Sequence, residues 1–175
     1  ESLAAADLVK AHHAAPQRAA KFPTAKTEPQ LAAAALRGLD VGRVFGMSAG
    51  FSLAALIRAA LDRTGPADVE IITWSSDEKN LRAVKDHPNA RSVRVTVGAG
   101  FHSQEPERCR GAASAVAPEN FRIAQTHAKI VTIRNAEHAI TLRGSMNLTA
   151  NPRAENFDAE NSAPVADFFA AFAAD

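Results

Sequence analysis

Two pairs of polar residues in the last third of this 175-residue sequence could carry chemistry. His127 and Lys129 stand two apart in QTHAKIVTI, and Ser145 and Asn147 stand two apart in RGSMNLT. Because side chains alternate between faces along a strand, the members of each pair would project to the same side of a β-strand. Together they would supply an imidazole, an ammonium, a hydroxyl and an amide. This set suits an oxyanion with several oxygens, and a phosphate fits best.

Basic residues gather around these pairs. Residues 121–153 carry five basic side chains against one acidic side chain, a local charge of +4, whereas residues 154–175 carry five acids and no base. A confined positive patch of this kind would attract a polyanion to one place. The basic residues are Arg122, Lys129, Arg134, Arg143 and Arg153.

Three of these arginines are candidate phosphate or nucleic-acid contacts, alongside Lys129 and Asn147. Each has an alternative. Arg134 and Arg143 could be solvated charges at strand ends, and Arg153 could form an ion pair with Glu155.

The overall composition limits the class of protein. A chain of 175 residues that is 46% hydrophobic is long enough for one domain with its own core and short for two. The formal net charge of +1 gives no global reason to expect a nucleic-acid or membrane partner. The longest apolar stretch, AGFSLAALIRAAL, is interrupted by Arg58 and is too short to span a bilayer. We therefore expect a soluble protein with no membrane partner.

The compartment stays open at this stage. Cys109 is the only cysteine, which excludes an intrachain disulfide and a cysteine-rich zinc site and suits a reducing compartment. The chain begins at Glu1 rather than Met, which is compatible with removal of a leader peptide. We expect a cytoplasmic rather than a secreted protein.

Strands and helices are predicted to alternate along the chain. Helices are expected over 28–40, closed by Gly38, over 52–65, with Ser52 as cap and Gly65 as stop, and over 77–87. Strands are expected within 41–50, 67–74 and 91–97. This alternation predicts an α/β domain with a mixed β-sheet flanked by helices. Residues 1–30 are predicted to form an N-terminal arm and residues 31–175 the single domain.

The second half of the chain should present the polar pairs on a hairpin. Residues 98–120, rich in Gly, Ser, Pro and charge, are predicted to be a long loop. The β-rich runs 126–133 and 138–144 are predicted to form an antiparallel hairpin. A C-terminal amphipathic helix is expected over 162–175, with Val165, Phe168, Phe169 and Phe172 in the core.

The motifs HAK and GSMNLT resemble the HxK and GSxN signature of the phospholipase D superfamily, whose members cleave or exchange phosphodiesters. The resemblance covers residues 125–155 closely and implies a phospholipase D-like domain. It implies that His127 is the nucleophile or acid/base and that Lys129 and Asn147 hold phosphate oxygens. Ser145 would support that pocket, and Glu155 is the candidate acceptor that fixes the imidazole tautomer. No metal ion and no cofactor are implied.

The chain departs from the family pattern at one position and lacks a second motif. The family motif continues from HxK to an Asp, and Arg134 stands at that position here. The chemistry of the family also needs two histidines, yet there is one HxK, and His12, His13, His87 and His102 lack the signature. The resemblance therefore implies a homodimer in which two copies build one site, as in small bacterial nucleases of the superfamily.

Two function classes follow. The first is a phosphodiesterase, expected to be a metal-independent nuclease acting on nucleic acid, DNA in preference to RNA, through a phosphohistidine intermediate. The alternative is a catalytically weakened or inactive nucleic-acid-binding or assembly module on the same fold, with Arg134 marking a decayed site. A phospholipase is disfavoured, because a second motif and an amphipathic membrane-binding stretch are missing. Trp74 could stack on a base or pack under the helices.

Overall fold

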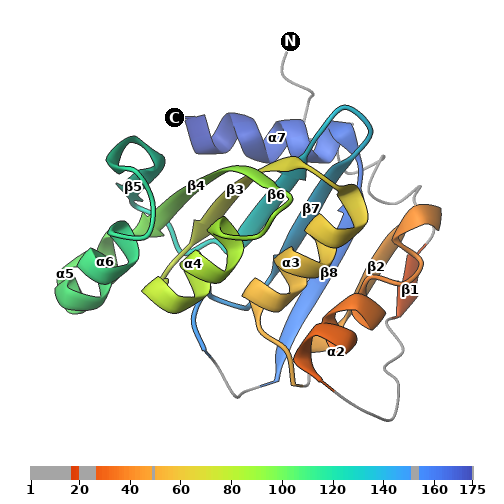
Figure 1. The fold of residues 1–175 in the computed structure, drawn as a ribbon, viewed down its shortest axis with the longest axis horizontal. Coiled ribbons are helices and arrows are strands. Elements are labelled where there is room, and N and C mark those ends of the chain that lie inside the picture. The colour runs from red at the N-terminus through yellow and green to blue at the C-terminus, as the bar shows by residue number, and fades with distance from the viewer. Residues whose placement is uncertain (1–16, 20–26, 49, 151–153, 175) are drawn as a thin grey trace.

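The computed structural model describes residues 17–19, 27–48, 50–150 and 154–174, which form one mixed β-sheet with helices on both faces (Figure 1). The strands are β1 (Gln17–Ala19), β2 (Arg43–Ser48), β3 (Ala67–Thr73), β4 (Ala90–Gly98), β5 (Phe121–Ala124), β6 (Ile130–Arg134), β7 (Ala139–Gly144) and β8 (Glu155–Asn161). The helices are α2 (Glu28–Ala35), α3 (Leu53–Thr64), α4 (Glu78–Lys85), α5 (Ala99–Gln104), α6 (Pro106–Ala113) and α7 (Ala163–Ala174), with 3-10 turns at Leu39–Val41 and Pro118–Asn120.

The strand order is β1-β2-β8-β7-β6-β3-β4-β5. The pairs β1–β2, β3–β4 and β4–β5 are parallel, and the pairs β2–β8, β8–β7, β7–β6 and β6–β3 are antiparallel. The strands of the first half and the hairpin of the second half therefore interleave in one sheet. The predicted fold class, a mixed sheet flanked by helices, is confirmed.

Helix α3 shows how local sequence produces the element. The Ser52 hydroxyl accepts a hydrogen bond from the Ala55 amide, which satisfies one of the free N–H groups of the first turn. At the other end, Gly65 has φ +68°, a left-handed conformation that glycine adopts without a steric penalty. Both ends agree with the prediction from the sequence.

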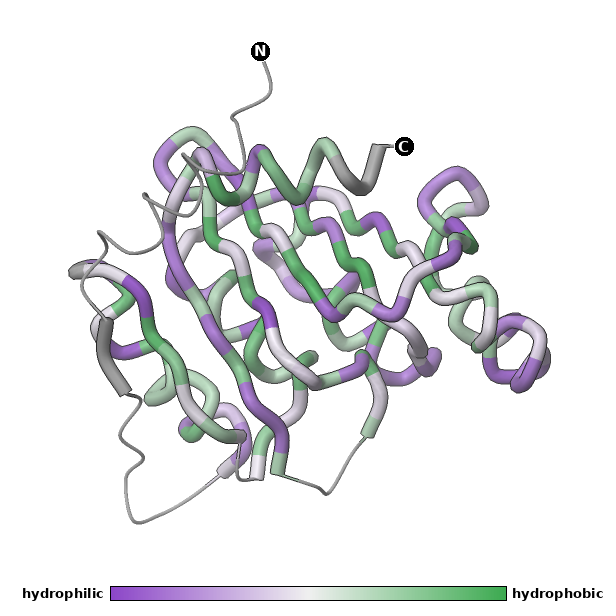
Figure 2. The backbone as a smooth tube through the Cα atoms, turned by 180° about the vertical axis from the view of Figure 1, so that it is seen from behind, coloured by the Kyte–Doolittle hydropathy of each residue, from purple (hydrophilic) through white to green (hydrophobic). Residues whose placement is uncertain are grey.

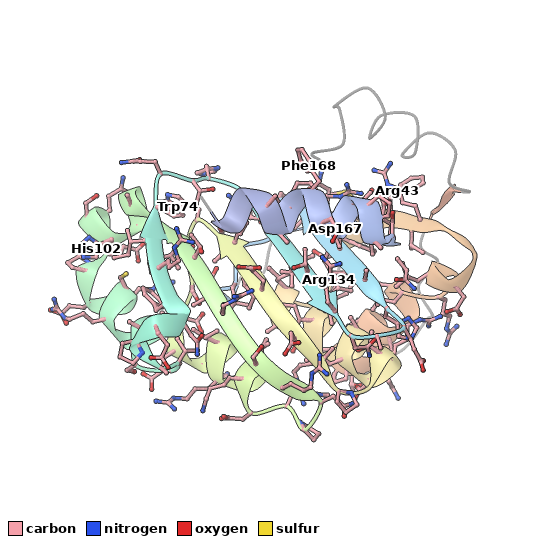
Figure 3. The ribbon with its side chains drawn as sticks, turned by 90° about the horizontal axis from the view of Figure 1, so that it is seen from above. Arg43, Trp74, His102, Arg134, Asp167 and Phe168 are labelled. Atoms are coloured by element: carbon pink, nitrogen blue, oxygen red, sulfur yellow. The ribbon has the colours of Figure 1, made fainter. Side chains whose placement is uncertain are left out.

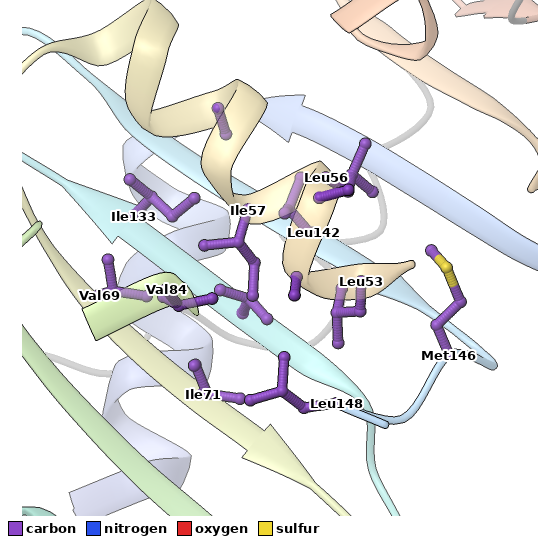
Figure 4. Packing of buried hydrophobic residues seen from close by; sticks show 14 of the residues in the cluster. Leu53, Leu56, Ile57, Val69, Ile71, Val84, Ile133, Leu142, Met146 and Leu148 are labelled. Atoms are coloured by element: carbon purple, nitrogen blue, oxygen red, sulfur yellow. The ribbon is translucent and has the colours of Figure 1, made fainter. Parts of the chain in front are cut away.

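The core lies between the sheet and helices α2 to α4 (Figure 4). Leu56, Ile57 and Leu61 of α3 are fully buried, and they share this cluster with Ile71 of β3 and Ile133 of β6. In Figure 2, which shows the molecule from behind, β6 and β7 carry hydrophobic residues, whereas the neighbouring β8 is largely hydrophilic. Helix α7 covers β6 and β7 on the other face.

The prediction of a long loop over residues 98–120 is wrong. The segment forms α5 and α6 and a 3-10 turn. Pro106 stands in the first turn of α6, where its missing N–H is not needed, so this proline starts a helix rather than interrupting one. Phe101, Cys109 and Ala112 are buried and attach the segment to the core.

Strand β8 was not predicted from the sequence. Its sequence, ENFDAEN, has three acids and no β-branched residue, which is atypical of a strand. It nevertheless pairs on both sides, with β2 and β7, because its acidic side chains Asp158 and Glu160 meet arginines across the sheet. The short strands β1 and β5 were missed as well.

The C-terminal helix is confirmed, and Val165 is buried as predicted. The prediction that Phe168 lies in the core is wrong: its side chain is 43% exposed and lies on the outer side of α7. The side chain of Phe172 lies outside the described part of the chain.

The predicted boundary between an N-terminal arm and the domain stays a prediction. Most of residues 1–30 lies outside the described residues. Gln17–Ala19 pair with β2 as an edge strand, and α2 begins at Glu28. Within the described ranges, we find no helix with the length and apolar character required to cross a bilayer.

Candidate functional site

One edge of the sheet collects the polar residues singled out in the sequence. Strands β2, β3 and β7 end at this edge, whereas β6 and β8 begin there, as the antiparallel registers show. His127 and Lys129 immediately precede β6, Ser145 and Asn147 follow β7, and Glu155 begins β8. Ligands of open α/β sheets commonly bind outside the carboxyl ends of strands, so this edge is the candidate active site.

His127 and Lys129 reach each other without lying on a strand. Strand β6 begins only at Ile130, so the expectation that strand alternation aligns the pair is wrong. The Lys129 ammonium folds back instead. Its Nζ donates to the His127 carbonyl at 2.7 Å and lies 3.1 Å from His127 Nδ1. His127 itself is an exposed residue.

The Lys129 ammonium is half-buried, and its charge state responds to two opposing influences. Burial lowers the pKa of Lys129, and the nearby Glu155 carboxylate raises it in part. Glu155 therefore acts electrostatically on the same ammonium that contacts His127.

Ser145 connects the end of β7 to the start of β8. Its hydroxyl donates to the Glu155 carboxylate and accepts from the Asn156 amide at 3.1 Å. Gly144, just before it, is required sterically, because a Cβ at this position would lie 2.2 Å from the Asn156 carbonyl oxygen. The Gly-Ser pair thus allows the two strands to approach and fixes the Glu155 carboxylate.

Asn147 is oriented by β3 and the loop that follows it. Its Oδ1 lies 3.3 Å from the Thr73 hydroxyl and accepts from the Ser75 amide at 3.4 Å. With the oxygen occupied in this way, the NH₂ group is the part of the amide that remains for a ligand. Thr73 and Ser75 were not recognised in the sequence, because their role depends on a contact over more than 70 positions.

Trp74 is a further neighbour of the imidazole. Its ring centroid lies 5.8 Å from that of His127 and 6.1 Å from that of Phe101. Gly98, at the end of β4, permits this arrangement: a Cβ there would lie 2.7 Å from both the Thr126 carbonyl oxygen and Trp74 Cδ1. A glycine directly after an apolar strand is the sequence signal that could have indicated this close approach.

Arg134 and Arg143, both expected as phosphate contacts, form ion pairs in the structure, and Arg143 lies near this edge, opposite Ile130 of β6. Arg134 ends β6 at the opposite edge, and its guanidinium pairs with Asp167 of α7 at 2.6 Å (Figure 3). Arg143 points toward α7, pairs with Asp158 at 2.5 Å and Glu160 at 2.6 Å, and lies over the Phe169 ring. The acids of residues 154–175 therefore neutralise part of the basic segment. Arg153 lies outside the described residues.

Two hollows lie near the site. A small cavity of about 10 Å³ is lined by residues of the site itself, including Asn147 and Glu155. A much larger groove, about 1020 Å³, runs between α2, α3 and α4, and the two share Phe51 and Ser52. His127 and Lys129 line neither hollow, so the small cavity shares only Asn147 and Glu155 with the candidate site. In the described ranges, no group of three or more His, Cys, Asp or Glu side chains is placed to hold a metal ion.

Comparisons with known proteins show similarity in structure but not in sequence. No family model and no curated protein matches the sequence. Nuc from Salmonella typhimurium, described as a phospholipase D family member, is similar with a TM-score of 0.52 and 18% identity, over 75% of this chain and 90% of that one. A polyphosphate kinase from Porphyromonas gingivalis has a TM-score of 0.49 and 17% identity, over 78% of this chain and 26% of that one. The fold is phospholipase D-like, as the resemblance of the motifs implied.

Proposed function

We propose that this chain is a phosphodiesterase of the phospholipase D type, and specifically a nuclease that cleaves nucleic-acid backbones without a metal ion. The observation that carries the proposal is the gathering of an exposed imidazole, an ammonium and an oriented amide at one edge of the sheet. The similarity in fold to a phospholipase D family member supports the same chemistry. Lys129 Nζ and the Asn147 NH₂ group would hold two oxygens of the scissile phosphate, as charge-assisted and neutral donors respectively.

The proposed reaction has two steps. In the first, Nε2 of His127 attacks phosphorus and the bond to the leaving oxygen breaks, while a second histidine, present as the imidazolium, protonates that oxygen. In the second, the same second imidazole removes a proton from water, and the resulting hydroxide displaces His127 from phosphorus. Atoms balance as hydrolysis of one phosphodiester by one water, and both histidines return to their initial state.

The second imidazole would be His127 of the partner subunit in a homodimer. The described chain has one HxK segment, and His127 is exposed at the sheet edge, where a second copy can reach it. A two-fold axis would place two identical half-sites face to face.

The contact between Lys129 and His127 bears on the protonation state that each role requires. If the charged ammonium donates to Nδ1, the neutral imidazole carries its proton on Nε2, whereas protonation of a leaving group needs the imidazolium, which carries protons on both nitrogens. The nucleophilic copy needs the opposite tautomer, with Nδ1–H donating to an acceptor. Glu155, which already lies close enough to influence Lys129, is the acceptor we propose.

Supercoiled plasmid and single-stranded DNA, each incubated with the protein in EDTA, test the proposal. We expect cleavage to persist in EDTA and to fall by at least about a hundredfold in His127→Ala. His138→Ala is the matched control, because His138 lies in the β6–β7 turn at the opposite edge of the sheet. Denaturing the enzyme during turnover of labelled DNA should trap a labelled protein adduct that His127→Ala lacks.

The alternative function predicts different results. A binding or assembly module would retain DNA without cleaving it in both the wild type and His127→Ala. Cleavage that requires a divalent metal, or that survives in His127→Ala, would contradict the mechanism. Parallel assays on RNA decide the expected preference for DNA, and vesicles of phosphatidylcholine test the disfavoured lipid substrate.

A further inference from the structure

We infer that Trp74 forms a nucleobase-binding surface beside the reacting imidazole, so that the site takes a nucleotide rather than any phosphodiester. This inference rests on the proposed function and names the part of the substrate that the site recognises. Its starting point is the ring contact: the centroids of Trp74 and His127 are 5.8 Å apart, with the planes inclined by 43°. A phosphate bonded to the imidazole would place its neighbouring nucleoside within reach of the indole.

The indole extends from the core to the surface. On its inner side it meets Phe101, which is fully buried, and on its outer side it meets the exposed His127. Trp74 itself is half-buried, packed against the core on one side and beside the exposed His127 on the other. An aromatic ring that is held by core packing on one side and is accessible on the other is well suited to stacking on a planar base.

The backbone holds the indole in place. A Cβ at Gly98 would lie 2.7 Å from Trp74 Cδ1, and a Cβ at Gly100 would lie 3.4 Å from Trp74 Nε1. The Gly98 amide also donates to the Trp74 carbonyl at 3.1 Å. The ring therefore rests directly on the start of α5, and little conformational entropy remains to be lost when a base stacks on it.

The remaining groups at this edge explain why a base contact is needed. Lys129 and Asn147 can hold phosphate oxygens, but these contacts exist in every phosphodiester. Arg134 and Arg143 were the arginines expected to bind further phosphates of a nucleic acid. Arg134 is paired with Asp167 of α7 and Arg143 with Asp158 of β8. Stacking on Trp74 would then supply the preference for nucleic acid without selecting a particular base, because every base has a π-face.

The sequence makes a direct test possible. Trp74 is the only tryptophan, and the chain contains no tyrosine, so the intrinsic fluorescence of the protein reports this one ring. We expect thymidine 5′-phosphate and short single-stranded oligothymidylate to quench the emission in a saturable manner. Deoxyribose 5-phosphate, inorganic phosphate and an abasic oligonucleotide should not. Equal changes with base-bearing and base-free ligands, or no change with any of them, would overturn the inference.

A kinetic test uses matched substrates that differ only in the base beside the scissile bond. Trp74→Leu should lower kcat/KM by about tenfold on the base-bearing substrate, with little change on the abasic one. Trp74→Phe, which keeps an aromatic ring, should lie between wild type and Trp74→Leu. Phe168→Leu is the matched control, because Phe168 is an exposed aromatic residue on the outer side of α7.

The outcomes separate this inference from the proposed function. Equal losses on both substrates would mean that Trp74 only positions His127, and they would refute a base contact. If the wild type hydrolyses nothing, the proposed function fails, but the fluorescence titration needs no turnover and still decides whether a base binds at Trp74.

Discussion

Nζ of Lys129 lies 3.1 Å from Nδ1 of His127 and 2.7 Å from the carbonyl oxygen of the same residue. The ammonium thus holds both the ring and the backbone of the histidine that would attack phosphorus. The Ser145 hydroxyl holds Glu155 in turn, and Glu155 raises the pKa of Lys129 against the effect of burial. The two motifs are therefore coupled through one carboxylate, and changes in one motif should affect the protonation of the other.

The pH dependence of activity should report this coupling. Only the charged form of Lys129 neutralises a phosphate. Burial lowers the pKa of Lys129 from its ordinary 10.5, so the ammonium loses its proton, and the enzyme its activity, as the pH rises toward that value and before it is reached. Glu155→Gln removes the influence that raises this pKa, so the alkaline limb should move to still lower pH. Profiles of kcat/KM up to about pH 10 measure the shift.

Glu137→Gln is the control for this experiment, because it removes the same charge in the exposed β6–β7 turn. Its alkaline limb should coincide with that of the wild type. An unchanged or upward-shifted limb in Glu155→Gln would show that Glu155 does not govern Lys129.

Gly98→Ala should damage both stability and activity. The new Cβ would lie 2.7 Å from the Thr126 carbonyl oxygen and 3.1 Å from the Trp74 carbonyl oxygen, so backbone must move next to His127. We expect a loss of about 1–3 kcal/mol in the free energy of unfolding, measured by urea denaturation. In Gly111→Ala, by contrast, the Cβ meets only Glu78 at 3.8 Å inside α6, and stability should be unchanged or slightly higher.

Arg134 should matter for the attachment of α7 and not for catalysis. The side chains of Arg134 and Asp167 are 35% and 61% exposed, so Arg134→Gln should cost at most about 1 kcal/mol and leave kcat/KM unchanged. Arg134→Asp, which restores the residue of the family motif, should be less stable because it faces Asp167, and it should not gain activity. The double variant Arg134→Asp/Asp167→Arg should recover the loss. A gain of activity in Arg134→Asp would contradict this assignment.

Mixing of subunits should reveal a shared site. If each site needs His127 from two copies, an excess of His127→Ala protein should capture wild-type subunits in dimers with one imidazole. Activity should then fall toward the small fraction of wild-type dimers, and specific activity should also fall on dilution. A wild type that is unaffected by excess His127→Ala after subunit exchange, and that is fully active as a monomer by light scattering, would exclude a shared site.

Local patterns explain why part of the fold was predictable. Helix α3 has apolar residues at helical spacing, Ser52 as a cap and Gly65 as a stop, and all of these act within a few positions of one another. Strand β8 has no such pattern. Its acids become acceptable on a buried strand only through Arg43 and Arg143, which are supplied by two other strands.

In the candidate site, too, some features were predictable from the local sequence and others depended on tertiary contacts. The spacing of His127, Lys129, Ser145 and Asn147 predicted a phosphate site, and the structure brings these residues to one edge of the sheet, while phosphate binding stays a prediction. Their alignment by strand alternation was not correct, because β6 begins after Lys129 and the ammonium folds back onto the imidazole.

The sequence by itself determined helices α2, α3, α4 and α7 and most strands, since periodicity and end signals act over a few residues. It also determined which residue types could hold a phosphate. Only the tertiary structure decided which charges remain available: Arg134 and Arg143 are engaged by carboxylates of residues 158–167, while Trp74 comes to lie beside His127. The physical reason is that strand order and register join segments far apart in the chain, and the charge and ring contacts at a sheet edge depend on that pairing.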